Sequence, residues 1–249
     1  MDKYFSNRRT IRRYSDREVS DSLIDSILEA AMRAPTCGNM QLYSVVVNRD
    51  PEMIKRLAPT HFNQPSVMGC GALLTVCADF NRFTRWCRLS KADPGFDNFL
   101  SFLNAATDAI VFAQQIVTVA EMEGLGTCWL GTVTYNAESI SEILELPDLV
   151  VPVAALTLGW PDESPDLVER LPLRAIRHDE KYRADSDEQI VDLFKAKDDF
   201  APNAKYVEEN NKETLAQVFT DCRYPRSMNE DFSKSFIAHL RKRGFLPEK

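Results

Sequence analysis

The amino-acid sequence predicts a globular domain of mixed α and β structure. Its 249 residues are 44% apolar and 27% charged, a composition that can bury one sizeable core and is unlike a disordered or fibrous chain. Strand-length apolar runs follow segments whose apolar residues recur at helical spacing. Neither internal repeats nor low-complexity tracts interrupt this order, so we expect one domain.

The first part of the chain predicts a helix, a strand and a second helix. Ser20 and Asp21 precede apolar residues at helical spacing, and the pattern ends before Pro35, as in an amphipathic helix with a capping residue at its start. Residues 44–48 are β-branched and flanked by turn residues, which predicts a strand. Residues 51–57 begin with proline and predict a short helix.

The longest helical pattern covers residues 96–123 and follows another strand-length apolar run at residues 72–78. One stripe along this helix is apolar and consists of Phe99, Leu103, Ala106, Ile110, Ala113, Ile116, Val117 and Ala120. Because the apolar face is wide, the helix can be buried on more than one side, in a core or against a second subunit.

Glycine and proline divide the next part of the chain. The sequence Gly-Leu-Gly at 124–126 ends the long helix, and residues 127–131 predict a short strand that runs into a turn, where glycine permits close approach to a ligand. Residues 136–144 suggest a helix that Pro147 stops, and residues 150–158 predict a strongly apolar strand.

The composition changes near Ile176. Residues 176–213 are rich in Asp, Glu, Lys and Asn, and Asp231 is expected to cap a last helix, 232–243, that Gly244 closes. This part is too short and too polar at its start to predict an independent domain.

We therefore predict a core of residues 1–175 and a C-terminal extension, residues 176–249, that belongs to the same domain. The formal net charge of −7 and the pI near 5.1 argue against a general nucleic-acid binder. No uninterrupted apolar run is long enough to span a bilayer, and the polar start lacks the apolar region of a signal peptide, so we expect a cytoplasmic protein. The six cysteines include no Cys-x-x-Cys pair and the three histidines are scattered, which argues against a zinc site.

A basic cluster lies near the start of the chain, although the chain as a whole has a negative net charge. Four guanidiniums and a hydroxyl crowd the segment Arg8-Arg9-Thr10-Ile11-Arg12-Arg13-Tyr14. Guanidiniums bind phosphate through charge-assisted, bidentate hydrogen bonds, so this segment predicts a local anion site. From the segment alone, a solvated basic arm is an equal alternative. Ile11 is expected to anchor the segment in the core, and Arg13 fits a surface position as well as a ligand contact.

The motifs of nucleophilic and phosphoryl-transfer enzymes are missing from the sequence. It contains no Gly-x-Ser-x-Gly elbow, no Walker-type Gly-Lys-Ser/Thr, no Gly-x-Gly-x-x-Gly after a strand and no His-Glu-x-x-His. If the protein is an enzyme, we therefore expect a cofactor to carry the reaction.

Several segments, in this order and spacing, resemble the FMN-dependent nitroreductase family. They are the basic cluster, Ala34-Pro35-Thr36-Cys37-Gly38-Asn39-Met40-Gln41, and Glu123-Gly124-Leu125-Gly126-Thr127-Cys128-Trp129-Leu130-Gly131. More narrowly, Cys77-Ala78-Asp79-Phe80-Asn81-Arg82 and Leu158-Gly159-Trp160-Pro161 look like the oxygen-insensitive NADPH nitroreductase and NADPH-flavin oxidoreductase subfamily. Each motif is weak alone, and the ordered set is specific.

This resemblance implies an α+β nitroreductase-like fold, with a central mixed, mainly antiparallel sheet flanked by helices and a C-terminal excursion that packs on a partner subunit. It implies FMN at the interface of a homodimer, NADPH or NADH as reductant, and a ping-pong, two-electron reduction of nitroaromatics, quinones or free flavin. No catalytic side chain is implied, because the chemistry is that of FMN.

The resemblance also implies which residues hold FMN. Those expected at the phosphate and ribityl end are Arg8, Arg9, Thr10 and Arg12, with Arg170 from a later loop. Those expected at polar atoms of the ring or ribityl chain are Gln64, Gln41 and Asn39, where a turn role is the alternative for Asn39. Those expected along the isoalloxazine are Trp129, Leu130 and Gly131, whose backbone amides can donate to the reduced ring. Core packing is the alternative for the Trp129 side chain.

Two positions depart from the family pattern. Val168 stands where the subfamily often has a lysine, so we expect weaker FMN binding. The region that carries arginines for the 2′-phosphate of NADPH reads Asn210-Asn211-Lys212-Glu213-Thr214, with Arg223 or Arg226 as distant substitutes. We therefore expect NADH to be used at least comparably.

Three alternatives remain open from the sequence. The first is a flavin reductase that supplies reduced FMN to a partner, which loose FMN binding would favour. The second is a flavin-binding or sensing protein without turnover, in which the loop 83–97, with Trp86, Arg88 and Lys91, fills the site instead of covering it. The third is a globular domain with a phosphate- or nucleic-acid-binding arm, which would make the ordered motifs a coincidence.

Overall fold

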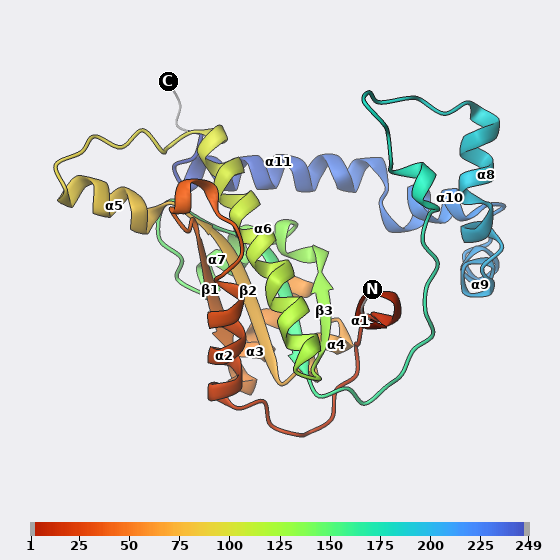
Figure 1. Cartoon of the computed structure of the whole chain (residues 1–249), viewed down its shortest axis with the longest axis horizontal. Coiled ribbons are helices and arrows are strands. Elements are labelled where there is room, and N and C mark those ends of the chain that lie inside the picture. The colour runs from red at the N-terminus through yellow and green to blue at the C-terminus, as the bar shows by residue number, and fades with distance from the viewer. Residues whose placement is uncertain (1–2, 247–249) are drawn as a thin grey trace. The chain divides into compact units, whose positions relative to one another are not determined.

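The computed structural model describes residues 3–246, which divide into two compact units (Figure 1). The first unit contains the described residues up to Pro165 and those from Phe232 onward, and the second unit is Asp166–Asp231. The boundary predicted after residue 175 lies inside the second unit. That the extension embraces a partner subunit stays a prediction.

The first unit is built on one four-stranded sheet with the order β1-β2-β4-β3. Its strands are β1 (Tyr43–Asn48), β2 (Ala72–Asp79), β3 (Gly126–Leu130) and β4 (Val150–Gly159). All three pairings between these strands are antiparallel, which confirms the mainly antiparallel sheet. Among the described residues no parallel pair gives the sheet the mixed character that was expected.

The two central strands are buried along their whole length, whereas β1 at one edge is half exposed. Helices cover both faces of β2 and β4, so a side chain on either face needs to be apolar. This explains why the two strands appear in the sequence as unbroken apolar runs without alternation.

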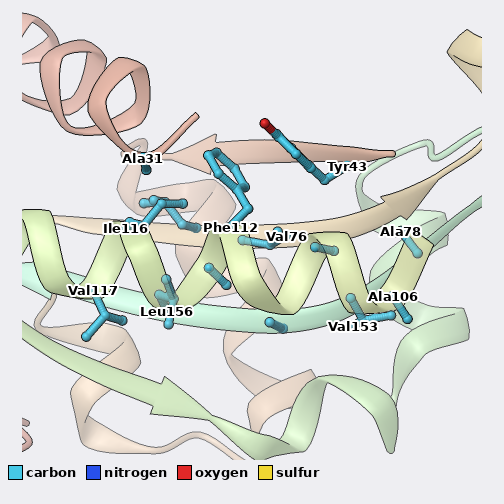
Figure 2. Packing of buried hydrophobic residues seen from close by; sticks show 14 of the residues in the cluster. Ala31, Tyr43, Val76, Ala78, Ala106, Phe112, Ile116, Val117, Val153 and Leu156 are labelled. Atoms are coloured by element: carbon cyan, nitrogen blue, oxygen red, sulfur yellow. The ribbon is translucent and has the colours of Figure 1, made fainter. Parts of the chain in front are cut away.

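One face of the sheet is covered by α2 (Asp21–Ala31) and the long helix α6 (Phe99–Met122). Figure 2 shows Phe112, Ile116 and Val117 of α6 packing over Val76 and Leu156 of the central strands. The predicted stripe is correct only in part. Its alanines, Ile116 and Val117 are buried, but its three bulkiest remaining members are about half exposed: Phe99, Leu103 and Ile110.

The other face of the sheet is covered by short helices, which share a second apolar cluster with β3. These elements are α3 (Pro51–Leu57), α4 (Pro65–Met68), α7 (Ala137–Ile143) and the 3-10 turns η2 (Ala58–His61) and η3 (Gly131–Thr134). The sheet therefore lies between two helical layers, with the turns η2 and η3 at the end of β3.

The length and the apolar composition of helix α6 raise the question whether it could span a membrane. By length and mean hydropathy it could cross a membrane, although polar residues interrupt its apolar run, and half of its most apolar window is buried. It packs on α2 and on the sheet, which is the position of a core helix.

The prediction of a loop at residues 83–97 is wrong for the first half of that segment. Residues up to Leu89 belong to the helix α5 (Asn81–Leu89). Phe83 and Phe96 pack against the buried ring of Phe80, with the Phe80 and Phe96 ring centroids 4.7 Å apart. The two phenylalanines of this segment therefore pack against the core, while Trp86 is exposed.

The second unit is helical. It contains η4 (Leu173–Ala175), α8 (Asp187–Asp198), α9 (Ala201–Glu209), α10 (Leu215–Gln217) and a π-helical turn, η5 (Val218–Arg223). Ser186 and Gln189 form a capping box at the start of α8. The last helix, α11 (Arg226–Lys242), begins after Pro225 and continues into the first unit. Asp231 lies inside it, so the expected capping role of Asp231 is wrong. A short α1 (Lys3–Asn7) starts the first unit.

Two buried histidines make the stability of the fold depend on pH. His61 and His239 are almost fully buried, and burial lowers the pKa of each imidazole to about 4. Within residues 3–246, one nitrogen of each ring has no hydrogen-bond partner. In the unfolded state the imidazole has a pKa near 6.5. As the pH falls from about 6.5 to about 4, the unfolded state therefore binds protons that the folded state does not bind.

We therefore expect the free energy of unfolding to be insensitive to these groups above about pH 6.5 and to fall below it, by on the order of 3 kcal/mol for each histidine once the pH reaches 4. Urea denaturation of the wild type and of His61→Gln and His239→Gln between pH 7.5 and 4.5 measures this. In each variant the free energy of unfolding should fall less steeply with decreasing pH than it does in the wild type. An unchanged slope in both variants would contradict the assignment.

Candidate functional site

The basic cluster lies directly against strand β3. The Ile11 amide donates to the carbonyl of Thr127 at 3.0 Å, and the Ile11 side chain is buried, as expected. A Cβ atom at Gly126 would lie only 2.6 Å from the Ile11 Cβ, so β3 can accept this neighbour only with glycine there. This contact places the arginines on both sides of Ile11 at the edge of the sheet.

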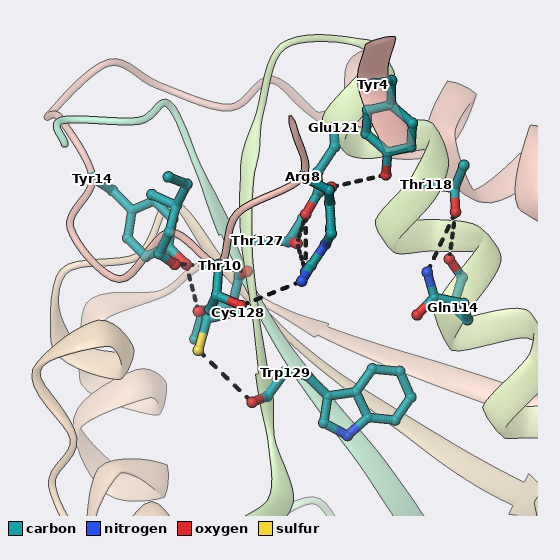
Figure 3. A network of polar contacts seen from close by, with 12 residues as sticks. Tyr4, Arg8, Thr10, Tyr14, Gln114, Thr118, Glu121, Thr127, Cys128 and Trp129 are labelled. Atoms are coloured by element: carbon teal, nitrogen blue, oxygen red, sulfur yellow. Dashed lines mark hydrogen bonds and ion pairs between the residues drawn. The ribbon is translucent and has the colours of Figure 1, made fainter. Parts of the chain in front are cut away.

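Arg8 is held by a carboxylate that the sequence analysis missed. Glu121, near the end of α6, accepts from Arg8 Nη2 at 3.1 Å and from Arg8 Nε at 3.3 Å (Figure 3). The Thr127 hydroxyl also donates to Glu121, and Tyr4 donates to it at 2.8 Å. Burial and the bond to Glu121 raise the pKa of Tyr4 to about 12. The free edge of Arg8 donates from Nη1 to Thr10 Oγ1 at 3.3 Å.

A cavity of about 280 Å³ lies beside this network and is lined by Arg8, Arg9, Glu121 and Glu163 among others. Arg9 Nη1 donates to the carbonyl of Asn7 at 3.3 Å. Its Nε is buried and, among the described residues, has no acceptor. A buried guanidinium donor without an acceptor is costly, which makes Arg9 a candidate ligand for an anion.

Arg12 and Arg13 contact the cavity rim through their backbone. Both amides donate to Glu163 Oε1, at 2.5 Å and 3.1 Å, and the Arg13 side chain pairs with the other oxygen. These bonds lower the pKa of Glu163. The Arg12 side chain is exposed and the Arg13 side chain is 73% exposed, so Arg13 occupies a surface position.

Trp129, Leu130 and Gly131 continue along the same edge from β3 into η3. The Trp129 side chain is 36% exposed, so its alternative as an ordinary core residue is wrong. Gly131 is exposed, and a Cβ added there would meet nothing within 4 Å. The backbone of Gly131 therefore borders open space.

Gln64 lies at the start of α4, on a loop attached to this edge. His61 Nδ1 and Thr132 Oγ1 are 2.9 Å apart, and Asn136 donates to the carbonyl of Thr60 at 2.7 Å. The first contact joins the turn before Gln64 to the turn that begins at Gly131, and the second joins it to the start of α7. We name the group at this edge, Arg8, Arg9, Thr10, Arg12, Gln64 and Trp129 to Gly131, the β3-edge half-site.

Asn39 and Gln41 lie elsewhere, on the turn just before β1. Gly38, Asn39 and Gln41 all have positive φ, a conformation that costs energy for the two residues with side chains. The turn is held by Asp108, a buried carboxylate on α6. Asp108 accepts from Thr36 Oγ1 at 2.6 Å, from the Cys37 amide at 2.9 Å and from the Leu42 amide at 3.3 Å.

The structure does not bring all predicted site residues together. β1 and β3 are the two opposite edges of the sheet, three strand spacings or about 14 Å apart. Asn39 and Gln41 therefore form a separate β1-edge half-site within one chain. Arg170 belongs to the second unit, where its Nη1 donates to the carbonyls of Val168 and Glu169.

Three positioning carboxylates escaped the sequence analysis. Glu121 and Glu163 contact residues more than 100 positions away in sequence, and no local pattern marks such pairs. Asp108 carries a local signal, because it is a lone acidic residue between buried alanines of a core helix. In residues 3–246 no group of three His, Cys, Asp or Glu side chains could hold a metal ion, and all six cysteines are free.

The fold and the site define a class of protein with an antiparallel sheet between two helical layers and a pocket lined by arginines and glutamates at one edge strand. The family profile described as "Nitroreductase family" matches residues 5–79 and 101–160 of this chain. The chain belongs to the Nitroreductase family and is an oxidoreductase. This confirms the family resemblance and the fold class that it implied.

Curated relatives and solved structures agree with this assignment. The chain is 33% identical to the oxygen-insensitive NADPH nitroreductase of Salmonella typhimurium, over 75% of this chain and 79% of the relative. It is 30% identical to the FMN reductase [NAD(P)H] of Bacillus subtilis, over 99% of this chain and 98% of the relative. A solved structure from Bacteroides fragilis, described only provisionally as an oxidoreductase, is 47% identical with a TM-score of 0.97, covering 99% of this chain and 100% of that chain.

Replacing Asp108 tests its role in holding the β1-edge half-site. In Asp108→Asn the amide NH₂ replaces one of the two carboxylate oxygens and faces a backbone donor, Cys37 or Leu42, so we expect the free energy of unfolding to fall by about 2 kcal/mol. Chemical denaturation measures this. Thr36→Val removes one partner, and the double variant should be less destabilised than the sum of the single variants. Additive effects would contradict a shared network.

Proposed function

We propose that this chain is an FMN-dependent NAD(P)H oxidoreductase that reduces flat acceptors such as nitroaromatics, quinones or free flavin. The observation that carries the proposal is a cavity beside the β3-edge half-site that Arg8 and Arg9 line, where the buried Arg9 Nε has no acceptor among the described residues. Curated relatives are named as an NADPH nitroreductase and as FMN reductases, which supports the same activity. We also propose a cytoplasmic location, in keeping with the acidic chain.

The residues at the cavity fit the phosphate of FMN. Arg9 offers a donor that lacks an acceptor, and Arg8 presents its Nη1 edge together with the Thr10 hydroxyl. Charge-assisted bonds of this kind are the common protein solution for phosphate. Arg12 has an exposed side chain and can join them, and the role of Arg170 stays a prediction.

The end of β3 fits the flavin ring. Open space next to Gly131 lets a flat ring approach the backbone, and the half-exposed indole of Trp129 is next to it in sequence. When FMN is bound, two-electron transfer between a nicotinamide and an acceptor is the chemistry that it supplies. The protein binds and orients it, and the amides of residues 129–131 are available to stabilise negative charge at the ring.

The arrangement of the two half-sites supports a homodimer. The end of β3 is separated by three strand spacings, about 14 Å, from β1, and Asn39 and Gln41 of the same chain lie beyond the start of β1. A second copy can bring its own β1-edge half-site to a flavin ring at the end of β3. The exposed side of α6, with Phe99, Leu103 and Ile110, offers an apolar surface for such a contact.

The second unit supports the use of NADH as well as NADPH. Lys212, the lone cation of its polar stretch, forms an ion pair with Asp221 at 2.8 Å. The Arg223 guanidinium lies over the Tyr206 ring at 4.7 Å. Lys212 is thus neutralised by a carboxylate of its own unit, which weakens it as a selector for a 2′-phosphate.

The visible spectrum of the purified protein tests the proposed activity. The protein should carry flavin absorbance that bleaches on anaerobic addition of NADH as well as NADPH and returns when a quinone or a nitroaromatic is added. Comparable bleaching rates are expected for the two nucleotides. Flavin that binds and is never bleached would support the non-catalytic alternative instead, and a large kcat/KM advantage for NADPH would contradict the expectation about the reductant.

Gly131 tests where the ring lies. A side chain there meets no protein atom, so Gly131→Val should leave the melting temperature nearly unchanged while it blocks the approach of the ring. We expect at least a tenfold loss of flavin affinity, measured by fluorescence titration. Gly95→Val, at another open position, is the matched control. Normal flavin binding in Gly131→Val would place the ring elsewhere.

A further inference from the structure

The cavity proposed for the flavin phosphate carries its own counter-charge. Of its charged lining residues, two are arginines and two are glutamates: Arg8, Arg9, Glu121 and Glu163. The formal charge of this lining is zero. A dianionic phosphate would therefore meet a neutral pocket, although the sequence of the basic cluster suggests a strongly positive one.

Glu121 binds the side chain of Arg8 through more contacts than Glu163 makes with that of Arg13. Its side chain is only 8% exposed, and Arg8 binds both of its oxygens with two nitrogens. The hydroxyls of Tyr4 and Thr127 donate to the same carboxylate, so three hydrogen bonds and an ion pair hold it in this position. Arg8 can offer a ligand its Nη1 edge, but the negative charge of Glu121 remains directly behind that edge.

Glu163 acts on the other side of the cavity. It accepts both the Arg12 and Arg13 amides, which are successive backbone donors of the kind that commonly bind anions. The chain thus fills this position with a carboxylate of its own. A phosphate in the cavity gains nothing from these two amides and is repelled by the residue that occupies them.

We propose that Glu121 and Glu163 set the affinity of the pocket for the flavin phosphate and keep FMN exchangeable. This inference rests on the proposed function, because it assumes that the cavity receives that phosphate. It favours FMN as a ligand that enters and leaves during the working life of the enzyme. Free FMN would then serve as a substrate as well as a cofactor.

Glu121→Gln tests the proposal. Gln keeps the length of the side chain and one acceptor for Arg8 while it removes one negative charge near the phosphate, so the dissociation constant for FMN should fall about three- to tenfold. Its dependence on ionic strength should become steeper. Riboflavin lacks the phosphate, and its affinity should not change. Glu123→Gln, an exposed neighbour with the same change of charge, is the control and should bind FMN as the wild type does.

Glu163→Gln is the second variant, since it removes the other carboxylate and should also tighten FMN binding. Thermal unfolding checks that each variant is folded. FMN binding that is unchanged or weaker in both folded variants would overturn the inference. A wild type that binds FMN no more tightly than riboflavin would instead overturn the phosphate site of the proposed function. Tighter riboflavin binding in Glu121→Gln would mean that the effect does not act through the phosphate, and would also overturn the inference.

Discussion

The site depends on one close contact between the start of the chain and a pair of glycines. Gly126 of β3 and Gly159 of β4 are cross-strand partners, and Ile11 and Tyr14 lie so close to them that a Cβ on either glycine would come within 2.7 Å of a side-chain atom. Tyr14 also bonds to the Ile11 carbonyl at 2.8 Å and to Thr157. This contact fixes residues 8–14 along the edge of the sheet, and the pocket, its arginines and its carboxylates all follow from it.

Much of the fold could be predicted because its signals are local. The capped helix after Ser20, the β-branched run before Asn48 and the unbroken apolar runs of β2 and β4 each show their own periodicity or composition. The errors occur where tertiary contacts decide. α6 exposes Phe99, Leu103 and Ile110 because α2 and the sheet cover only one side of it, and periodicity does not show which side of a wide apolar face is covered.

The arginines of the candidate site could be predicted from the sequence, whereas its two carboxylates could not. Arginines crowded into a short segment are visible in any reading of the sequence. Glu121 ends a helix and Glu163 follows a strand, and each appears in the sequence as an ordinary surface residue. Only folding brings them within hydrogen-bond distance of the arginine cluster. The charge cluster seen in the sequence therefore does not by itself give the net charge of the pocket that it helps to form.

The charge of the pocket also bears on the choice between two roles left open by the sequence. A resident cofactor needs net attraction that survives many reaction cycles, whereas a flavin that is handed on needs a pocket from which its phosphate can leave. Val168 stands where the family pattern often has a lysine, and in the proposed phosphate pocket the two carboxylates offset the charge of the two arginines. Under the proposed function, this balance lowers the attraction for the phosphate and leaves the open space beside Gly131 untouched. Such a pocket would weaken retention of the flavin without altering the place where its ring reacts, which is the combination that a flavin reductase requires.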